Sequence, residues 1–218
     1  MRSVLHGRYM AHIVVKPAQA ELARARETAK SPRLDASAWV QAGLNVLAKR
    51  GVEQLRIERL ALNLGVTKGS FYWHFKDRHD LLRAILEYWR KTTTLQVIAD
   101  LERSEMAPHE LFSHLLRYPY EFPDLQFPFE IELAVRVWSR TDARARNVLA
   151  EVDELRLRYL GNLFRRMGFS EQESVARARL SYSFMQLGSG FPSLPKEPHV
   201  LDACISLLMT KAGARLKR

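Results

Sequence analysis

The residues best suited to molecular recognition lie between positions 56 and 76 of this 218-residue chain. They combine cations, hydroxyl groups, large aromatic rings and a histidine within a few helical turns, which is poor material for a hydrophobic core. Such side chains donate hydrogen bonds to phosphates and to base edges, so they point to contacts with DNA. The candidate contact residues are Arg56, Thr67, Lys68, Gly69, Ser70, Tyr72, Trp73, His74 and Lys76.

Lys68 and Thr67 stand where a recognition helix begins, the position from which base edges are easiest to reach. Lys68 can donate to guanine O6 or N7, and Gly69 allows the backbone to approach the duplex closely. Ser70 suits a base or a phosphate, and Trp73 suits a sugar or a thymine methyl group. Local packing is the alternative role for Ser70 and Trp73. The other polar side chains suit phosphates, which orient the protein without reading sequence: Arg56, Tyr72, His74 and Lys76.

A short amphipathic helix is expected to precede these residues. Its apolar positions follow the i, i+3, i+4, i+7 spacing of one helical face, namely Ile57, Leu60, Ala61 and Leu64. Gly65 follows this stripe, where a left-handed residue commonly ends a helix. The segment therefore predicts a helix that stops at residue 64.

A second helix is expected over residues 68–74. Thr67 precedes it and offers a side-chain oxygen as a cap, while Phe71 and Phe75 have the i, i+4 spacing of inward-facing residues. Asp77 then starts another helix, with Asp80 as an acidic residue of the first turn. Two helices joined by a turn of three or four residues form a helix-turn-helix, whose second helix enters the major groove.

Residues 35–82 resemble the DNA-binding domain of TetR/AcrR-type transcriptional regulators. The matching positions are Gly51, Leu60, Ala61, Gly65, Val66, Thr67, Gly69, Tyr72, His74, Phe75, Leu81 and Leu82. One departure is Arg56, which stands where the family usually has a capping Thr. Because Arg has no acceptor atom, we expect no side-chain cap there and a phosphate contact instead.

The resemblance implies an all-α protein with an N-terminal helix-turn-helix head and a C-terminal helical body that binds a ligand and dimerises. The expected boundaries are an N-terminal extension over 1–31, the DNA-binding domain over 32–80 with its helix-turn-helix at 56–75, and the body over 81–218. The expected function is a repressor that a small-molecule effector releases from a palindromic operator. A dimer presents two recognition helices about 34–36 Å apart, so the operator should be nearly palindromic.

Bulk properties agree with a polyanionic partner. The net charge is +10, and residues 1–34 carry seven Lys or Arg against two Glu; a generally basic proteome is the alternative explanation. The single cysteine, Cys204, allows no intrachain disulfide, and no apolar run approaches the length of a membrane span. We therefore expect a cytoplasmic protein without membrane attachment. Met10 is a candidate for the true start of translation, and whether residues 1–31 contact DNA stays open.

The rest of the chain has the pattern of helices. The expected ranges are 35–50, 81–101, 108–117, 129–140, 142–167, 170–187 and 199–214, with a proline-rich aromatic stretch at 118–130 that is not helical throughout. In the first helix, Ala38, Ala42, Val46 and Leu47 are expected to face inward. Ser170 and Glu173 have the spacing of a capping box.

The body supplies two further candidate surfaces. A pocket for a small apolar or aromatic effector would be lined by Phe112, Phe122, Phe127, Phe129, Trp138, Tyr159, Phe164, Tyr182 and Met185. The last two helices have apolar faces that either close the core or pair with a second copy in a homodimer: Leu180, Phe184, Leu187, Leu201, Ile205, Leu208 and Met209.

Other function classes have weaker support. His109 and His114 are five residues apart, one too many for the i, i+4 zinc pair, so no metal or cofactor is expected. No phosphate-binding loop, serine elbow or reactive cysteine setting indicates an enzyme. Two alternatives stay open: a non-specific architectural DNA-binding protein without an effector, and an activator with the same head.

Overall fold

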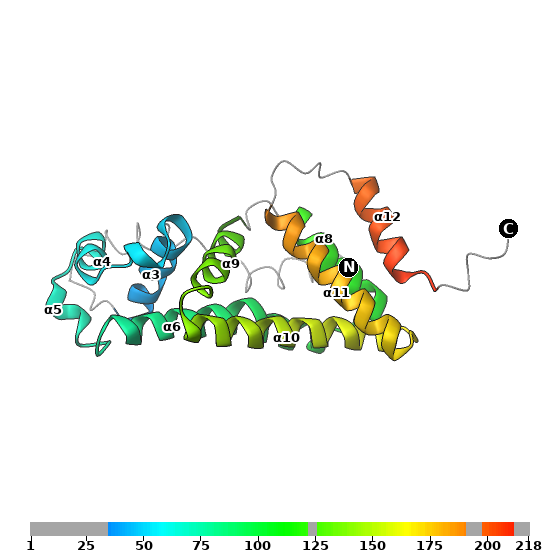
Figure 1. Cartoon of the computed structure of the whole chain (residues 1–218), viewed down its shortest axis with the longest axis horizontal. Helices are drawn as coiled ribbons and strands as arrows, with labels where there is room; N and C mark the ends of the chain where they lie inside the picture. The colour runs from blue at the N-terminus through cyan, green and yellow to red at the C-terminus, as the bar shows by residue number, and fades with distance from the viewer. Residues whose placement is uncertain (1–34, 122–125, 191–197, 212–218) are drawn as a thin grey trace. The chain divides into compact units, whose positions relative to one another are not determined.

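The computed structural model describes residues 35–121, 126–190 and 198–211, and these residues form helices and turns without any strand. The expected all-α fold is therefore confirmed (Figure 1). The chain divides into two compact units. The first comprises residues up to Asp100 together with Glu130–Leu149, and the second comprises Leu101–Phe129 and the residues from Ala150 onward. The predictions for residues 1–31 and for Met10 lie outside the described residues.

The first unit is built on α3 (Ala36–Arg50), which packs against α4 (Ile57–Leu64) and α6 (Arg78–Arg90). Asp35 caps α3 by accepting a hydrogen bond from the Ala38 amide at 3.0 Å. The expected inward face was wrong in phase, because Ala38, Ala42 and Val46 are only half-buried. Leu47 is buried as predicted, and the rest of the buried face is formed by Trp39, Val40, Gly43 and Leu44.

The shift in phase has a physical cause. Trp39 is fully buried and provides the largest apolar surface on α3, so its position decides which side of the helix turns inward. Gly43 lies on that same side and lets α6 approach closely. A Cβ atom added to Gly43 would lie 2.5 Å from Cδ1 of Ile85, which is too close for any real contact.

The helix expected over residues 81–101 is longer than predicted and is interrupted. It begins as α6 at Arg78, passes through the π-helical stretch Lys91–Leu95, and continues as α7 (Gln96–Arg103). The Thr92 hydroxyl donates to the Tyr88 carbonyl at 2.8 Å, and the Thr93 hydroxyl donates to the Trp89 carbonyl at 2.8 Å. Hydroxyls that bond back to carbonyls four residues earlier compete with the helical amides, which explains the local widening. The expected domain boundary at residues 80 and 81 falls inside α6.

Two further helices contribute to the first unit. α9 (Gln126–Trp138) and α10 (Ala143–Arg166) lie within a few residues of the predicted ranges 129–140 and 142–167. Asp142 accepts from the Arg144 amide at 2.8 Å and from the Ala145 amide at 3.3 Å, which fixes the start of α10. Gly168, with φ +82°, follows the end of α10.

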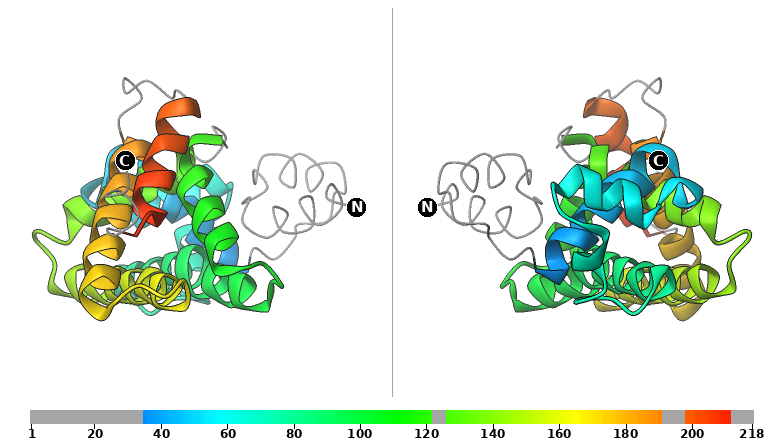
Figure 2. Two further views of the ribbon diagram at one scale, coloured as in Figure 1. Left: turned by 90° about the vertical axis from the view of Figure 1, so that its right-hand side faces the viewer. Right: turned by 90° about the vertical axis from the view of Figure 1, so that its left-hand side faces the viewer.

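In the second unit, α8 (Pro108–Glu121) packs against both α11 (Glu171–Gly190) and α12 (Pro198–Met209), as Figure 2 shows. The predicted capping box is confirmed: the Ser170 hydroxyl accepts from the Glu173 amide at 3.3 Å, and the Glu173 carboxylate accepts from the Ser170 amide at 3.3 Å. α8 continues four residues beyond the predicted end at 117, and α12 ends at Met209 instead of 214. Residues 122–125 of the aromatic stretch lie outside the described residues.

Candidate nucleic-acid interface

The turn between α4 and α5 (Lys68–Phe71) begins as predicted, with Gly65 ending α4. Gly65 adopts the left-handed conformation with φ +68° and ψ +30°. Its amide donates to the Leu62 carbonyl at 3.1 Å, and the Val66 amide donates to the Ala61 carbonyl at 3.0 Å. These bonds satisfy the carbonyls at the end of α4 and turn the chain toward α5.

Two predictions about the second half of the turn were wrong. The Thr67 side chain does not cap α5; its backbone carbonyl instead accepts from the Ser70 amide at 3.0 Å. The helix is also shorter than residues 68–74, since it ends at Phe71 and the chain continues through turns closed by the His74 amide on the Phe71 carbonyl at 3.0 Å. Gly69 weakens a helix this short, and Phe75 must return to the core.

Phe71 anchors α5 to the rest of the unit. Its side chain is fully buried, and its ring centroid lies 5.2 Å from that of Trp39 and 5.5 Å from that of Phe75. Phe75 is also buried, so the predicted inward orientation of both rings is confirmed. These contacts hold one side of α5 against α3 and leave the opposite side open.

The predicted contact residues lie largely at the surface. Trp73 is 87% exposed and Tyr72 is 53% exposed, which is unusual for large rings unless they meet a partner. The other candidates are exposed as well, except for the half-buried Ser70: Arg56, Thr67, Lys68, Gly69, His74 and Lys76. The exposure of Trp73 gives no support to a packing role for its side chain. The partial burial of Ser70 does support the packing alternative for that residue.

Electrostatics at the start of α5 involve a residue that sequence reasoning missed. The Lys68 ammonium lies 2.5 Å from Oε1 of Glu58, which is the second residue of α4. The hydrogen bond from Lys68 lowers the pKa of the Glu58 carboxylate, and the hydrogen bond to Glu58 raises the pKa of Lys68. The only signal for this ion pair in the sequence is an acid ten residues before a cation of the recognition helix. That spacing predicts a contact only when the geometry of the turn is known.

A second missed residue is Arg78, at the start of α6. Its Nε donates to the Leu55 carbonyl at 2.7 Å and its Nη2 donates to the Val52 carbonyl at 2.6 Å. Val52 is the first residue of η1 (Val52–Gln54), and Leu55 follows the end of η1, shortly before α4. Arg78 therefore fixes the entry to α4. The Arg56 side chain makes no cap for α4, as predicted.

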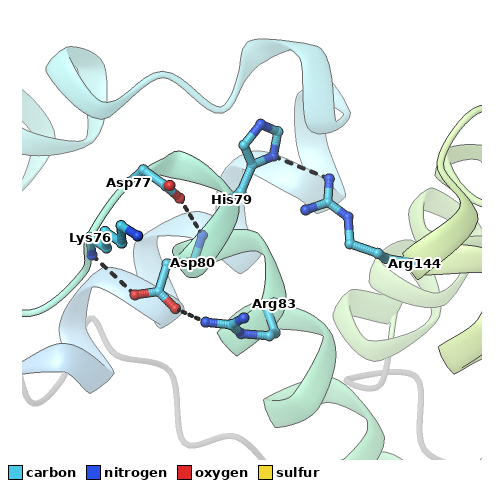
Figure 3. Close-up of a pocket in the computed structure, with 6 residues that line it drawn as sticks. All are labelled: Lys76, Asp77, His79, Asp80, Arg83 and Arg144. Atoms are coloured by element: carbon cyan, nitrogen blue, oxygen red, sulfur yellow. Dashed lines mark hydrogen bonds and ion pairs between the residues drawn. The ribbon is translucent and has the colours of Figure 1, made fainter.

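A small polar pocket of about 260 Å³ lies beside the start of α6 and is lined by Lys76, Asp77, His79, Asp80, Arg83 and Arg144 (Figure 3). The Asp77 carboxylate accepts from the Asp80 amide at 2.9 Å and so caps α6, in agreement with the predicted helix start at Asp77. The backbone amide of Lys76 donates to Asp80 at 3.0 Å; this bond, followed by the one from Arg83, lowers the pKa of Asp80.

Two residues that line this pocket connect α6 to the start of α10. The Arg144 guanidinium lies 3.1 Å from Nδ1 of His79 and also donates to Asp142 at 3.0 Å. Because a guanidinium only donates, Nδ1 of His79 is the acceptor in this contact. The Arg144 hydrogen bond is also the main cause that lowers the pKa of Asp142.

The predicted effector-pocket residues are divided between the two units. Trp138 belongs to the first unit, and Phe112, Phe129, Tyr159, Phe164, Tyr182 and Met185 belong to the second. Phe122 and the side chain of Phe127 lie outside what the structure describes. In the second unit, the Phe112 and Phe164 rings are fully buried with centroids 4.7 Å apart.

Polar groups lie among these aromatic rings. The Tyr182 hydroxyl donates to Asp153 at 2.6 Å and accepts from Arg156 at 3.3 Å. The Tyr159 hydroxyl is buried and has no hydrogen-bond partner among the described residues. Burial is the main cause that raises the pKa of Tyr159 to about 12, and the charge of Glu102 adds to it.

The predicted dimer faces are only partly exposed. Leu201 and Ile205 are buried in the second unit and Leu180 is 62% exposed. Phe184, Leu208, Met209 and Cys204 are half-buried, and the Leu187 side chain is not described. Leu207, which was not predicted, is 52% exposed. The core interpretation therefore holds for Leu201 and Ile205, and the exposed leucines are the part available to a partner.

Two searches of the described residues gave negative results. No group of three or more His, Cys, Asp or Glu side chains within residues 35–121, 126–190 and 198–211 could hold a metal ion. Within the same ranges, no helix combines the length and the apolar character that crossing a bilayer requires.

The described residues are helical and contain a helix-turn-helix whose second helix is anchored by the buried Phe71. The protein is therefore in the class of helical proteins with a helix-turn-helix head. Comparison with known proteins is more specific: residues 40–85 match the family model described as "Bacterial regulatory proteins, tetR family". Over these residues the chain is similar to the TetR family of regulators.

Similarity to individual curated proteins covers part of the chain. The chain is 33% identical over 82 residues to the uncharacterized HTH-type transcriptional regulator TtgW of Pseudomonas putida, covering 37% of this chain and 61% of that one. It is 40% identical over 55 residues to the class C tetracycline repressor protein of Escherichia coli, covering 25% of each. The matches thus span less than two thirds of these relatives.

The fold extends the similarity beyond the head. A crystal structure of a TetR-family transcriptional regulator from Rhodococcus sp. superposes with a TM-score of 0.63 at 19% identity. The superposition covers 80% of this chain and 98% of that one. At this identity the likeness shows a shared fold.

Proposed function

We propose that this protein is a sequence-specific DNA-binding transcriptional regulator that acts as a repressor. We also propose that it is located in the cytoplasm. The observation that carries the proposal is the division of residues 68–75 into buried and exposed side chains. Phe71 and Phe75 are buried, while Lys68, Tyr72 and Trp73 are exposed. The name of the similar tetracycline repressor supports repression as the direction of control. The DNA-binding domain is assigned to residues 32–80, the extension to 1–31 and the body to 81–218.

The proposed DNA complex has Lys68 and Thr67 at base edges, with Gly69 against the duplex backbone and Trp73 on a sugar or a thymine methyl group. Arg56, Tyr72, His74 and Lys76 contact phosphates, and half-buried Ser70 contacts a base or a phosphate. A homodimer binds two such half-sites, so the operator is a near-palindrome with half-sites about 34–36 Å apart. Exposed Leu180 and Leu207 support a dimer, because burying leucines against a second copy removes apolar surface from water.

Control by a small apolar or aromatic effector is proposed for the body. The candidate lining residues of the second unit are retained, namely Phe112, Phe122, Phe127, Phe129, Phe164, Tyr182 and Met185. Trp138 belongs to the first unit and is not placed with them. Tyr159 supports a ligand with a hydrogen-bond acceptor, because its buried hydroxyl otherwise lacks a partner among the described residues. Release from the operator needs a difference in affinity of about 5 kcal/mol between the two states of the protein.

The first test is selection of bound fragments from genomic DNA, followed by binding measurements on the recovered duplex. We expect an inverted repeat. The Lys68→Ala variant should weaken binding to that duplex about 5- to 150-fold and relax the preference at one base position in each half-site. Lys49→Ala is the matched control, since Lys49 is an exposed cation of α3 outside the proposed surface. Equal losses on all sequences would move Lys68 to the phosphate-contact class, and recovery of unrelated fragments contradicts the proposal.

An architectural DNA-binding role is the second candidate, and the net charge of +10 favours it. The two functions differ in the ratio of specific to non-specific affinity at a fixed salt concentration. A regulator shows a ratio of about 10³ or more, and an architectural protein does not. Transcription from a reporter that carries the recovered repeat distinguishes a repressor from an activator.

A further inference from the structure

Lys68, the residue proposed to read a guanine, already has a partner in the free protein. Its ammonium lies 2.5 Å from the Glu58 carboxylate, although both side chains are largely exposed, at 51% and 64%. The ion pair joins the first residue of α5 to the second residue of α4. Two exposed charges in water gain little free energy from each other, so the pair does not matter much for folding. Its consequence lies in what approaches this surface.

Two residues proposed to contact DNA act electrostatically on the Glu58–Lys68 pair. The positive charge of Arg56 helps to lower the pKa of Glu58, and the Tyr72 phenol helps to raise the pKa of Lys68. Three other described acids of the head have structural roles. Asp35 and Asp77 accept from backbone amides at the starts of α3 and α6, and Asp80 accepts from the Lys76 amide. Glu58 instead places a carboxylate where phosphates would arrive.

A carboxylate at this position affects specific and non-specific complexes differently. Resting on the proposed DNA binding, we infer that Glu58 is a specificity-determining residue that keeps Lys68 from binding phosphates and reads a cytosine beside the guanine taken by Lys68. A guanine offers O6 and N7 as acceptors to Lys68, and a cytosine offers its N4 amino group as a donor to Glu58. Each of the two side chains therefore replaces its contact with the other by a contact with a base. On other sequences Lys68 stays paired with Glu58, so it is withheld from the phosphates while the Glu58 carboxylate gains no cytosine donor.

The Glu58→Gln variant tests this role, because it removes the charge and keeps the size of the side chain. The probes are the duplex recovered by selection and a shuffled duplex of the same length and composition. On the shuffled duplex we expect Glu58→Gln to bind about two- to fivefold more tightly, since Lys68 becomes available to phosphates. The slope of log K against log salt should steepen by about 0.9 per protomer, the value for one additional phosphate contact.

On the recovered duplex the same variant should bind less tightly, because an amide cannot replace the carboxylate as a pure acceptor for the cytosine amino group. The specificity ratio should therefore fall about tenfold, and the cytosine preference should disappear at one position of each half-site. Glu53→Gln is the control: Glu53 is an exposed acid of η1, so the change in net charge is identical while the Glu58–Lys68 pair stays intact. It should leave the specificity ratio at the parent value.

A second comparison asks whether Glu58 acts through Lys68. In a Lys68→Ala background, Glu58→Gln should no longer steepen the salt dependence on the shuffled duplex. A specificity ratio that is the same for Glu58→Gln and the parent, with the parent still preferring the recovered duplex, overturns the role of Glu58 and leaves the proposed function intact. A parent chain that prefers no duplex overturns both.

Discussion

Arg78 connects the start of α6 to the entry of α4, and its removal is expected to loosen the whole helix-turn-helix. In the Arg78→Met variant the apolar stem of the side chain is kept, but the donors to the Leu55 and Val52 carbonyls are lost. Each hydrogen bond from a charged donor contributes about 1.5–3 kcal/mol to stability. Because Arg78 is only half-buried and water partly replaces these bonds, we expect a total loss of about 2–4 kcal/mol.

Tryptophan fluorescence is a suitable assay for this loss. All four tryptophans, Trp39, Trp73, Trp89 and Trp138, belong to the first unit, so their emission reports the unit that contains Arg78. The expected loss corresponds to a fall in melting temperature of about 5–15 °C. DNA affinity should fall as well, because α4 carries Arg56 and Glu58 at its start.

The control is Arg83→Met, one turn further along α6. Arg83 pairs with Asp80 at the surface, where its side chain is 76% exposed, so its loss should hardly change stability. If Arg78→Met and Arg83→Met both have the melting temperature of the parent, the two carbonyl contacts do not hold α4 in place and the reasoning is refuted.

Two further predictions concern packing and pH. Gly43→Ala gains about 1 kcal/mol of helix propensity but loses about 1–3 kcal/mol to the clash with Cδ1 of Ile85 at 2.5 Å. Ile85→Val removes that atom, so it should destabilise the parent by about 0.5–1.5 kcal/mol and yet stabilise Gly43→Ala, as fluorescence-detected urea unfolding can show; additive effects of the two changes would contradict the close approach. For Tyr159, a folded-state pKa of about 12 against a usual value of 10.0 means that its contribution to stability is complete below pH 10 and is lost as the pH rises from 10 to 12. Tyr159→Phe should therefore flatten this alkaline loss in circular dichroism melts and leave stability at pH 7 unchanged or higher, and a melt that remains as steep in alkali assigns the loss to other groups.

The sequence by itself determined the local elements of the head. Asp35 and Asp77 as caps, Gly65 as the left-handed residue, and the inward pair Phe71 and Phe75 all follow from rules that act within a few residues. The capping box at Ser170 and Glu173 is of the same kind. Residues this close along the chain meet in one way once the helix forms, so their spacing is sufficient to predict the contact.

Tertiary structure decided everything that depends on contacts between elements. The phase of α3 was set by Trp39 and by the approach of Ile85 to Gly43, which no spacing along α3 reveals. The Arg78 bonds to Val52 and Leu55 span 26 and 23 residues. Glu58 and Lys68 form their ion pair only because the turn at Gly65 brings the starts of two helices together. A charged side chain can reach many partners, and the folded backbone alone selects which one it meets.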